Sequence, residues 1–301
     1  MTRTAFLGLG AIGAPMAVHL ARDFPPLTVW NRSAEKATAF AAEHGARAAA
    51  SPADAAREAD VVITCLPTSR EVEALLDGDA GLLAGMRSGA LLVDCTSGDP
   101  ATSRRIAARL AERGIGFIDA PVSGGTSGAA AGTLTVMVGG AERDLDRARQ
   151  VLDAFAGKIV HCGDVGAGHA VKAVNNALLA VHIWSTAEGL AALTASGVRP
   201  DLALDVINAS SGRSNASENL FPARVLTGQF PRTFRLALLD KDVGIAAEVA
   251  RDARVPSPVL QLVAELFRAA HIELGEEADH VEAVRVLERM SGVAIRSGGA
   301  A

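Results

Sequence analysis

Lys172 and Asn176 are the two side chains whose types and spacing most directly predict chemistry in this sequence. They lie four residues apart in the stretch Gly166-Ala-Gly-His-Ala-Val-Lys172-Ala-Val-Asn175-Asn176, so on a helix both side chains leave the same face. A lysine held beside an amide can take a proton from a hydroxyl or give one to a carbonyl. The alternative is a surface lysine among polar helix residues, since lysine is common on helices.

A loop rich in glycine and hydroxyl side chains is the second candidate, Asp119-Ala-Pro-Val-Ser123-Gly124-Gly125-Thr-Ser-Gly128. Consecutive glycines let backbone N–H groups converge on an anion, and a serine adds a side-chain donor. We expect the loop to bind a substrate carboxylate through Ser123, Gly124 and Gly125. A flexible linker is the alternative, but the loop lies between two predicted buried strands, which argues against free flexibility.

A third pattern, Gly8-Leu-Gly10-Ala11-Ile12-Gly13, follows an apolar run and opens a helical pattern. The first glycine allows a tight turn, the second lets a pyrophosphate approach the backbone, and the third lets the helix pack on the strand. This context predicts a dinucleotide-binding loop that includes the backbone of Ala11 and Ile12. A glycine-rich turn without a special role is the alternative.

The end of the second predicted strand reads Asn31-Arg32-Ser33, where an NAD site usually has Asp or Glu for the ribose 2′-hydroxyl. A guanidinium can pair with a 2′-phosphate, and a serine can add a hydroxyl and cap the next helix. We therefore predict that NADP is preferred, with NAD as the alternative cofactor. For Arg32 the alternative is a solvated surface charge.

Two later strand ends are expected to line the same dinucleotide site. Leu66 and Pro67 follow one apolar run, and Thr96 follows the next. Each could touch the adenosine or the nicotinamide portion of the cofactor. Ordinary turns followed by helix caps are the alternative.

The elements that must position these residues change in kind along the chain. In the first part, helical patterns separate short apolar runs, which lie at 5–9, 27–30, 61–66, 90–95, 116–119, 134–138 and 159–162. This alternation predicts an α/β domain with a Rossmann-type, doubly wound parallel sheet over residues 1–163. Residues 164–301 are predicted to form an all-helical domain. Its helices are expected at about 167–196, 200–210, 216–227, 235–253, 257–273 and 279–290.

Composition excludes several classes of function. The 301 residues carry a net charge of −5 without a basic block, so a nucleic-acid partner is not expected. The three cysteines form no CxxC pair, which favours buried, reduced thiols in a cytoplasmic protein over a metal site. Strand patterning begins at Thr4, so no leader peptide is expected. The apolar stretch 173–195 contains several polar residues and is predicted to be a core helix, with no membrane partner.

The sequence has no tyrosine, which excludes dehydrogenase mechanisms that use a tyrosine hydroxyl as the proton donor. Two histidines, His161 and His169, raise the alternative of a histidine base of the lactate-dehydrogenase kind. Neither lies in a recognisable His–Asp arrangement, so we interpret both as packing residues.

Taken together, the motifs resemble those of the β-hydroxyacid dehydrogenase family, and the resemblance covers essentially the whole chain. The matching segments are 8–16, 119–125, 132–134, 166–176 and Lys241-Asp242. The resemblance implies reversible NAD(P)-dependent oxidation of 3-hydroxyisobutyrate, or a related short β-hydroxyacid, to its semialdehyde. It also implies a homodimer or homotetramer that forms through the helical domain.

The resemblance further implies a role for each site residue. Ser123, Gly124 and Gly125 would hold the substrate carboxylate, and Lys172 would be the general acid/base. Asn176 would keep substrate and lysine in register, and Asn175 could share that role. Lys241 would reach the nicotinamide or the substrate edge; without the resemblance, a surface Lys-Asp pair would be the preferred interpretation.

Two alternatives remain open at this point. A reductase of glyoxylate, succinic semialdehyde or tartronate semialdehyde would use the same carboxylate loop and differ only in the pocket wall. A non-catalytic NADP-binding protein is the alternative of another class. The intact Lys172 and the uninterrupted Ser123-Gly124-Gly125 sequence argue against the second. Imine reductases share the architecture but generally replace the lysine, so its presence favours oxygen substrates.

Overall fold

The computed structural model describes residues 2–297, and the chain divides into two compact units, 1–172 and 173–301. The division falls inside one helix, α9 (Ala167–Ala195). The domain boundary predicted at residues 163 and 164 coincides with the end of strand β9 (Ala156–Gly163), just before this helix begins. That boundary stays a prediction.

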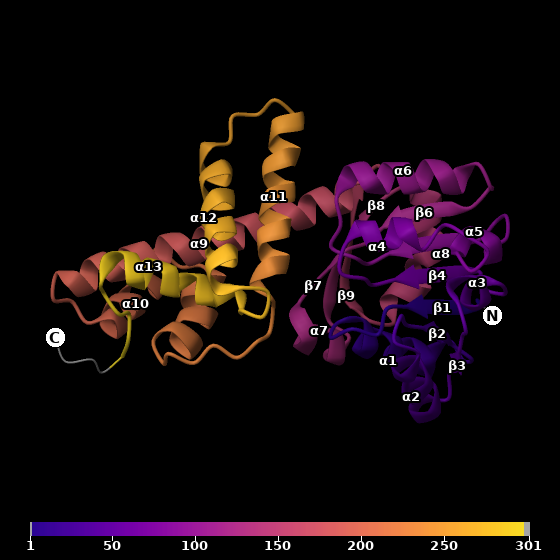
Figure 1. The fold of residues 1–301 in the computed structure, drawn as a ribbon, viewed down its shortest axis with the longest axis horizontal. Coiled ribbons are helices and arrows are strands. Elements are labelled where there is room, and N and C mark those ends of the chain that lie inside the picture. The colour runs from indigo at the N-terminus through magenta and orange to yellow at the C-terminus, as the bar shows by residue number, and fades with distance from the viewer. Residues whose placement is uncertain (1, 298–301) are drawn as a thin grey trace. The chain divides into compact units, whose positions relative to one another are not determined.

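The first unit is a nine-stranded sheet with helices on both faces (Figure 1). The strands run in the order β3-β2-β1-β4-β5-β6-β8-β7, and β9 pairs with β8. The strands besides β9 are β1 Thr4–Leu7, β2 Thr28–Trp30, β3 Arg47–Ala48, β4 Val61–Thr64, β5 Leu91–Asp94, β6 Gly116–Asp119, β7 Val122–Ser123 and β8 Leu134–Gly139. The order from β3 to β6 is that of the Rossmann fold, so the predicted doubly wound sheet is confirmed.

Successive side chains of the central strands enter two different cores, because side chains alternate between the faces of a sheet. On β1, Phe6 belongs to one core, while Ala5 and Leu7 belong to the other. The first core is completed by α1 (Gly13–Asp23), α2 (Ala34–His44), α7 (Gly125–Ala131) and α8 (Glu142–Asp153). The second is completed by α3 (Pro52–Ala56), α4 (Ser69–Ala74), α5 (Leu82–Gly85) and α6 (Pro100–Ala111).

The sheet differs from the prediction in two respects. Strands β3 and β7 were not predicted, because each has only two residues and leaves no periodic pattern. The sheet is also not wholly parallel, since β8 runs antiparallel to both β6 and β7. The connection from β7 to β8 contains only the short helix α7, whereas a parallel crossover needs a dozen or more residues.

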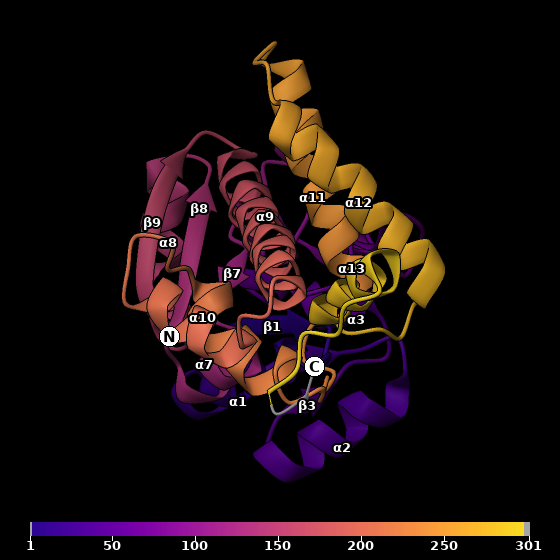
Figure 2. The same ribbon diagram turned by 90° about the vertical axis from the view of Figure 1, so that its left-hand side faces the viewer.

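Among its described residues, 173–297, the second unit has helices joined by loops and no strand. After α9 come α10 (Pro200–Asn208), the π-helix η1 (Ala216–Val225), α11 (Leu236–Asp252), α12 (Pro258–Leu274), the 3₁₀ helix η2 (His280–Ala283) and α13 (Val284–Ser291). Helices α11 and α12 lie side by side (Figures 1 and 2). The six predicted helical segments are all present. Pro222 lies inside η1.

Helix α9 supplies much of the second unit's core. Its Ala177, Ile183 and Leu190 are fully buried against side chains of the later helices. Among the described residues it is the one helix long and apolar enough to cross a membrane by length and composition. Of its most apolar 18-residue window, 39% is buried inside the protein. Part of the helix thus belongs to the core, as predicted from the sequence, and the expectation that no membrane is a partner stays a prediction.

Candidate active site

In the β1–α1 loop, two glycines are required by close backbone packing and one leaves open space. Gly8 has φ +109°, and a Cβ there would lie 2.2 Å from the carbonyl oxygen of Cys65. A Cβ on Gly13 would lie 2.0 Å from the oxygen of Gly8. A Cβ on Gly10, in contrast, would meet nothing within 4 Å. Gly8 and Gly13 are therefore required by the fold itself, whereas Gly10 leaves open space over the loop.

The backbone beside that open space has unused donors. The amides of Gly10, Ala11 and Ile12 donate to no acceptor within the described residues 2–297. Helix α1 begins directly after them at Gly13, and its first turn contains no acidic residue. Free amides at a helix N-terminus are a binding site for phosphate groups. These residues therefore fit the pyrophosphate of a dinucleotide.

Asn31 connects the second strand to this loop. Its Oδ1 accepts a hydrogen bond from the amide of Leu9 at 3.0 Å, and its Nδ2 donates to the oxygen of Ser33 at 3.2 Å. The sequence did not predict this contact, in which Asn31 fixes the backbone on both sides. Ser33 occupies the N-cap position of α2, but its side chain makes no capping bond, so that part of the expectation is wrong.

Arg32 is exposed at the start of α2, as a residue that binds a phosphate must be. A second exposed cation, Lys36, lies in the first turns of the same helix and was not singled out from the sequence. The available signal was only its cationic side chain shortly after the Asn31-Arg32-Ser33 segment. Both cations are accessible to a 2′-phosphate, although the exposed Glu35 lies between them in the sequence.

The ends of β4 and β5 are joined as expected for neighbouring strands. The amide of Leu66 donates to Thr96 Oγ1 at 3.1 Å, and the amide of Thr96 donates to Asp94 Oδ1 at 3.1 Å. Thr96 is buried and Pro67 is exposed. Burial and the nearby Asp94 carboxylate raise the pKa of the Cys65 thiol to about 12, so this cysteine stays protonated.

The glycine-rich loop after β6 is held by strand pairing, which argues against its being a flexible linker. Ser123 lies in β7, where it pairs with Thr135 of β8. The next residues, Gly124 and Gly125, have φ +135° and +65°, which glycine adopts readily. Their amides donate to no acceptor among the described residues. A Cβ on Gly125 would meet nothing within 4 Å, so this end of the loop is open to an anion.

Asp119, which precedes this loop, holds the first turn of α9. Its side chain is fully buried, and its Oδ1 and Oδ2 accept the amides of Gly166 at 2.6 Å and His169 at 2.9 Å. Burial raises the pKa of Asp119, although His169 and the two amides act in the opposite direction. A Cβ on Gly168 would lie 2.3 Å from the oxygen of Met137, so the helix start packs closely on β8.

Lys172 lies one turn after His169 on α9 and is only 8% exposed. Asn176, four residues further along the same helix face, is 4% exposed. A lysine is seldom buried to this extent unless its ammonium group is paired with another polar group. The interpretation of Lys172 as a solvated surface residue is therefore wrong.

The second unit holds the two asparagines and Lys241 in one hydrogen-bonded chain. Asn175 Nδ2 donates to Asn176 Oδ1 at 3.1 Å, and Asn176 Nδ2 donates to Asp242 Oδ2 at 2.6 Å. Lys241 Nζ donates to Asp242 Oδ1 at 2.6 Å. Asp242 is 2% exposed and connects both groups, yet no separate role was predicted for it from the sequence.

The two histidines considered as bases make hydrogen bonds inside the first unit. His161 Nε2 lies 2.8 Å from the oxygen of Gly140, and His169 Nδ1 lies 2.7 Å from Ser103 Oγ. Among the described residues neither ring forms a hydrogen bond or ion pair with a carboxylate, although His169 acts electrostatically on Asp119. These contacts agree with the structural role expected for both residues.

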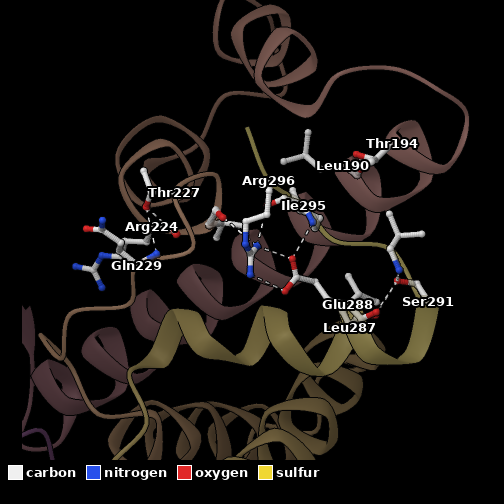
Figure 3. Close-up of polar contacts among 12 residues, drawn as sticks. Leu190, Thr194, Arg224, Thr227, Gln229, Leu287, Glu288, Ser291, Ile295 and Arg296 are labelled. Carbon is white, nitrogen blue, oxygen red and sulfur yellow. Dashed lines mark hydrogen bonds and ion pairs between the residues drawn. The ribbon is translucent and has the colours of Figure 1, made fainter. Parts of the chain in front are cut away.

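A hollow of about 390 Å³ in the second unit contains none of the predicted site residues. It lies beside α13, and its lining includes Arg285, Arg289 and Arg296. Each arginine is already paired with a glutamate, as Figure 3 shows for Arg296 and Glu288. Across residues 2–297 we also find no cluster of three or more side chains suited to hold a metal ion.

Comparison with known proteins places both units in one family. Residues 3–163 match the NAD-binding domain of 6-phosphogluconate dehydrogenase, and residues 166–287 match the NAD-binding domain of NADP-dependent 3-hydroxyisobutyrate dehydrogenase. The 2-(hydroxymethyl)glutarate dehydrogenase of Eubacterium barkeri is 36% identical, with 98% of each chain covered. The NAD-dependent L-serine dehydrogenase of Pseudomonas aeruginosa is 40% identical, covering 89% of this chain and 92% of the relative.

A solved structure agrees with these matches. The 3-hydroxyisobutyrate dehydrogenase of Mycobacterium tuberculosis, described with L-serine, superposes with a TM-score of 0.86 at 35% identity. The alignment covers 95% of this chain and 99% of the other. Fold and site together define an oxidoreductase of the nicotinamide-dependent class. The chain belongs to the β-hydroxyacid dehydrogenase family, whose members act on CH–OH groups with NAD(P).

Proposed function

We propose that this protein is an NADP-dependent dehydrogenase that reversibly oxidises 3-hydroxyisobutyrate, or a related short β-hydroxyacid, to its semialdehyde. The observation that carries the proposal is the burial of Lys172 on the same helix face as Asn176. A lysine held beside an amide can exchange a proton with a substrate hydroxyl or carbonyl. A non-catalytic protein would have no need to keep this arrangement.

The substrates named for the relatives support one chemical class. 2-(Hydroxymethyl)glutarate, L-serine and 3-hydroxyisobutyrate each carry a hydroxymethyl group on the carbon next to a carboxylate. They differ only in the third substituent of that carbon. The shared part needs an anion site and a proton acceptor, which we assign to the Ser123-Gly124-Gly125 loop and to Lys172.

Lys172 is the general acid/base in this proposal. In oxidation, its neutral amine takes the proton of the substrate hydroxyl. In reduction, its ammonium group gives a proton to the developing alkoxide. Asn176 and Asn175 hold the substrate in register with the lysine, and Lys241 contacts the substrate or the nicotinamide. The bound nicotinamide accepts or supplies the hydride.

The first unit holds the dinucleotide. The free amides of the Gly8–Gly13 loop bind the pyrophosphate, and Leu66, Pro67 and Thr96 line the rest of the cofactor. Arg32, with Asn31 and Ser33, favours the 2′-phosphate of NADP, and NAD is the weaker cofactor. The exposed Lys36 supports this preference, because a second cation adds to the attraction for a phosphate.

We also propose a cytoplasmic homodimer or homotetramer, formed through the helical unit. Large apolar side chains stay exposed on that unit, among them Leu202, Val206, Leu262 and Ile272. Exposed apolar side chains of this size are a feature of protein–protein interfaces. Light scattering on the purified protein would measure the assembly, and a monomer at micromolar concentration would contradict this part.

Lys172→Met tests the proposal directly. General acid–base catalysis contributes about 10²–10⁴-fold, so turnover of 3-hydroxyisobutyrate with NADP should fall by about that factor. Binding of NADPH, followed by its fluorescence, should stay within about twofold, because the dinucleotide loop is untouched. Lys158→Met, an exposed lysine of β9, is the matched control and should leave turnover unchanged.

Unchanged turnover in Lys172→Met would reject the mechanism. A panel of 3-hydroxyisobutyrate, L-serine, glycerate and 4-hydroxybutyrate, with the semialdehydes and glyoxylate in the reverse direction, identifies the substrate. The highest kcat/KM for glyoxylate, or for succinic or tartronate semialdehyde, would favour a reductase of the same family. No turnover of any of these compounds would favour a non-catalytic NADP-binding protein.

A further inference from the structure

His19 lies inside α1 and joins that helix to the C-terminal end of α7. Its Nε2 lies 3.0 Å from the carbonyl oxygen of Ala129 and 3.1 Å from that of Ala130. Carbonyl oxygens only accept hydrogen bonds, so Nε2 must carry the hydrogen and donate to both. The tautomer is therefore defined by the contact: Nε2 is the donor in the neutral ring as well as in the protonated one.

Two carbonyl oxygens at the end of α7 accept the His19 donor, and that of Ala129 also accepts the amide of Gly132 at 3.4 Å. The helix ends at Ala131, and Gly132 follows with φ +68° and an amide directed at the oxygens of Gly128 and Ala129. The last carbonyls of a helix have no partner inside it and carry partial negative charge. A Cβ on Gly132 would lie 3.2 Å from His19 Cε1, so the ring packs closely against this turn.

The two helices that His19 joins begin at the two proposed binding loops. Helix α1 starts at Gly13, the last glycine of the dinucleotide loop, and α7 starts at Gly125, the last residue of the carboxylate loop. Met16 of α1 and Ala129 of α7 also belong to the same core. A shift of one helix along its axis therefore acts on the other through both apolar packing and the His19 hydrogen bond.

We propose that His19 is a positioning residue that couples the dinucleotide loop to the carboxylate loop, so that a bound dinucleotide strengthens binding of the hydroxyacid. The inference rests on the proposed function, because both loops must bind as assigned there. Coupling between two ligands is reciprocal, so the acid must strengthen dinucleotide binding by the same factor. His19 itself touches neither ligand in this proposal.

The coupling can be measured without turnover, because NADPH and 3-hydroxyisobutyrate do not react with each other. Calorimetry on the full-length protein gives the Kd of the acid with and without saturating NADPH, and the ratio is the coupling factor. His19→Met removes the donor but keeps an apolar side chain of similar size. A hydrogen bond contributes about 1 kcal/mol, so the factor should fall by about fivefold.

Three further variants separate coupling from stability. His19→Gln places an amide N–H near the position of Nε2 and should restore the factor to within about twofold of wild type. In His19→Asn the side chain is polar but too short to reach either carbonyl oxygen. This variant is used in place of His19→Met if His19→Met does not fold. His44→Met makes the same change on α2, where the histidine contacts Phe40 and Glu43 and not α7, and should keep the wild-type factor.

Hydrogen exchange of the amides in residues 125–134 supplies an independent readout. NADPH should slow this exchange in the wild type and in His19→Gln, but not in His19→Met. A purely structural role of His19 would speed the exchange with and without NADPH and leave the difference intact, which would overturn the proposal. Three other results would also overturn the proposal. The coupling factor of His19→Met could equal that of the wild type, the factor of His19→Gln could be as low as that of His19→Met, or the wild-type protein could show no coupling, with a factor of one. The Lys172→Met turnover assay tests the proposed function separately, because it needs no coupling.

Discussion

Gly10→Ala should separate cofactor binding from folding. The added Cβ would meet no protein atom within 4 Å, and Gly10 lacks the positive φ of Gly8. Alanine at a compatible position stabilises by about 0.4–1 kcal/mol, mainly by restricting the unfolded chain. The melting temperature of the cofactor-free protein should therefore stay equal or rise by about 1–4 °C. The methyl group occupies the space assigned to the pyrophosphate, so the Kd for NADPH should rise at least about tenfold.

Gly13→Ala is the matched comparison, because its Cβ would lie 2.0 Å from the carbonyl oxygen of Gly8. The backbone must move to relieve this overlap, at a cost of about 2–3 kcal/mol, which lowers the melting temperature by about 5–10 °C. Thermal unfolding without cofactor and fluorescence titration with NADPH measure the two effects. If Gly10→Ala binds NADPH as tightly as the wild type, the reasoning about this loop is refuted.

Two other predictions concern the cofactor preference and the stability of the second unit. Arg32→Asp should lower the ratio of kcat/KM for NADPH to that for NADH by about 10–100-fold, because a charge-assisted hydrogen bond of about 1.5–3 kcal/mol is lost. An unchanged ratio would mean that Arg32 does not contact the 2′-phosphate. Asp279 is fully buried and accepts bonds from Arg224, at 2.9 Å, and from several amides. Burial alone would raise its pKa, but the hydrogen bond and charge of His280, with amides of the backbone, hold the pKa well below the usual range. A lowered pKa gives stability that is present above the unfolded value, about 3.9, and is lost as the pH falls below it. Asp279→Asn should therefore destabilise the protein by about 3 kcal/mol at pH 7 in urea unfolding, and the difference from wild type should shrink below pH 4; an equal difference at pH 7 and pH 3 would contradict the assignment.

The sequence predicted the elements whose patterns are local. Helix α9 was expected over 167–196 and occupies Ala167–Ala195, because its long apolar face and its glycine-rich start are both visible in the residues. The glycine loop was equally predictable, since the strand-turn-helix context gives Gly8 and Gly13 a steric reason and assigns Gly10 to the approach of the pyrophosphate. Strands β3 and β7 were not, because two residues are too few to show a period.

Contacts between distant residues were the part that the sequence could not supply. Asp242 bonds both Lys241 and Asn176, yet Asn176 is 66 positions away and no spacing rule connects them. Asp119 is similar, because its bonds to the amides of Gly166 and His169 depend on where β6 ends in the sheet. Such residues become visible only when the fold brings separate segments together.

Only Cys95 is fully buried, while Cys65 and Cys162 are partly exposed, yet the pKa values of all three thiols have a consequence for how the protein tolerates oxidants. Burial and neighbouring groups raise the pKa of all three thiols, to about 12 for Cys65 and well above the ordinary value for Cys95. Oxidants and alkylating agents react with thiolates, and at neutral pH a thiol with a pKa of about 12 is ionised in roughly one molecule in 10⁵. Cys65 directly precedes Leu66, which we assign to the cofactor site. A reactive thiol at that position would expose the proposed cofactor site to oxidation, and the raised pKa keeps Cys65 protonated and unreactive at neutral pH.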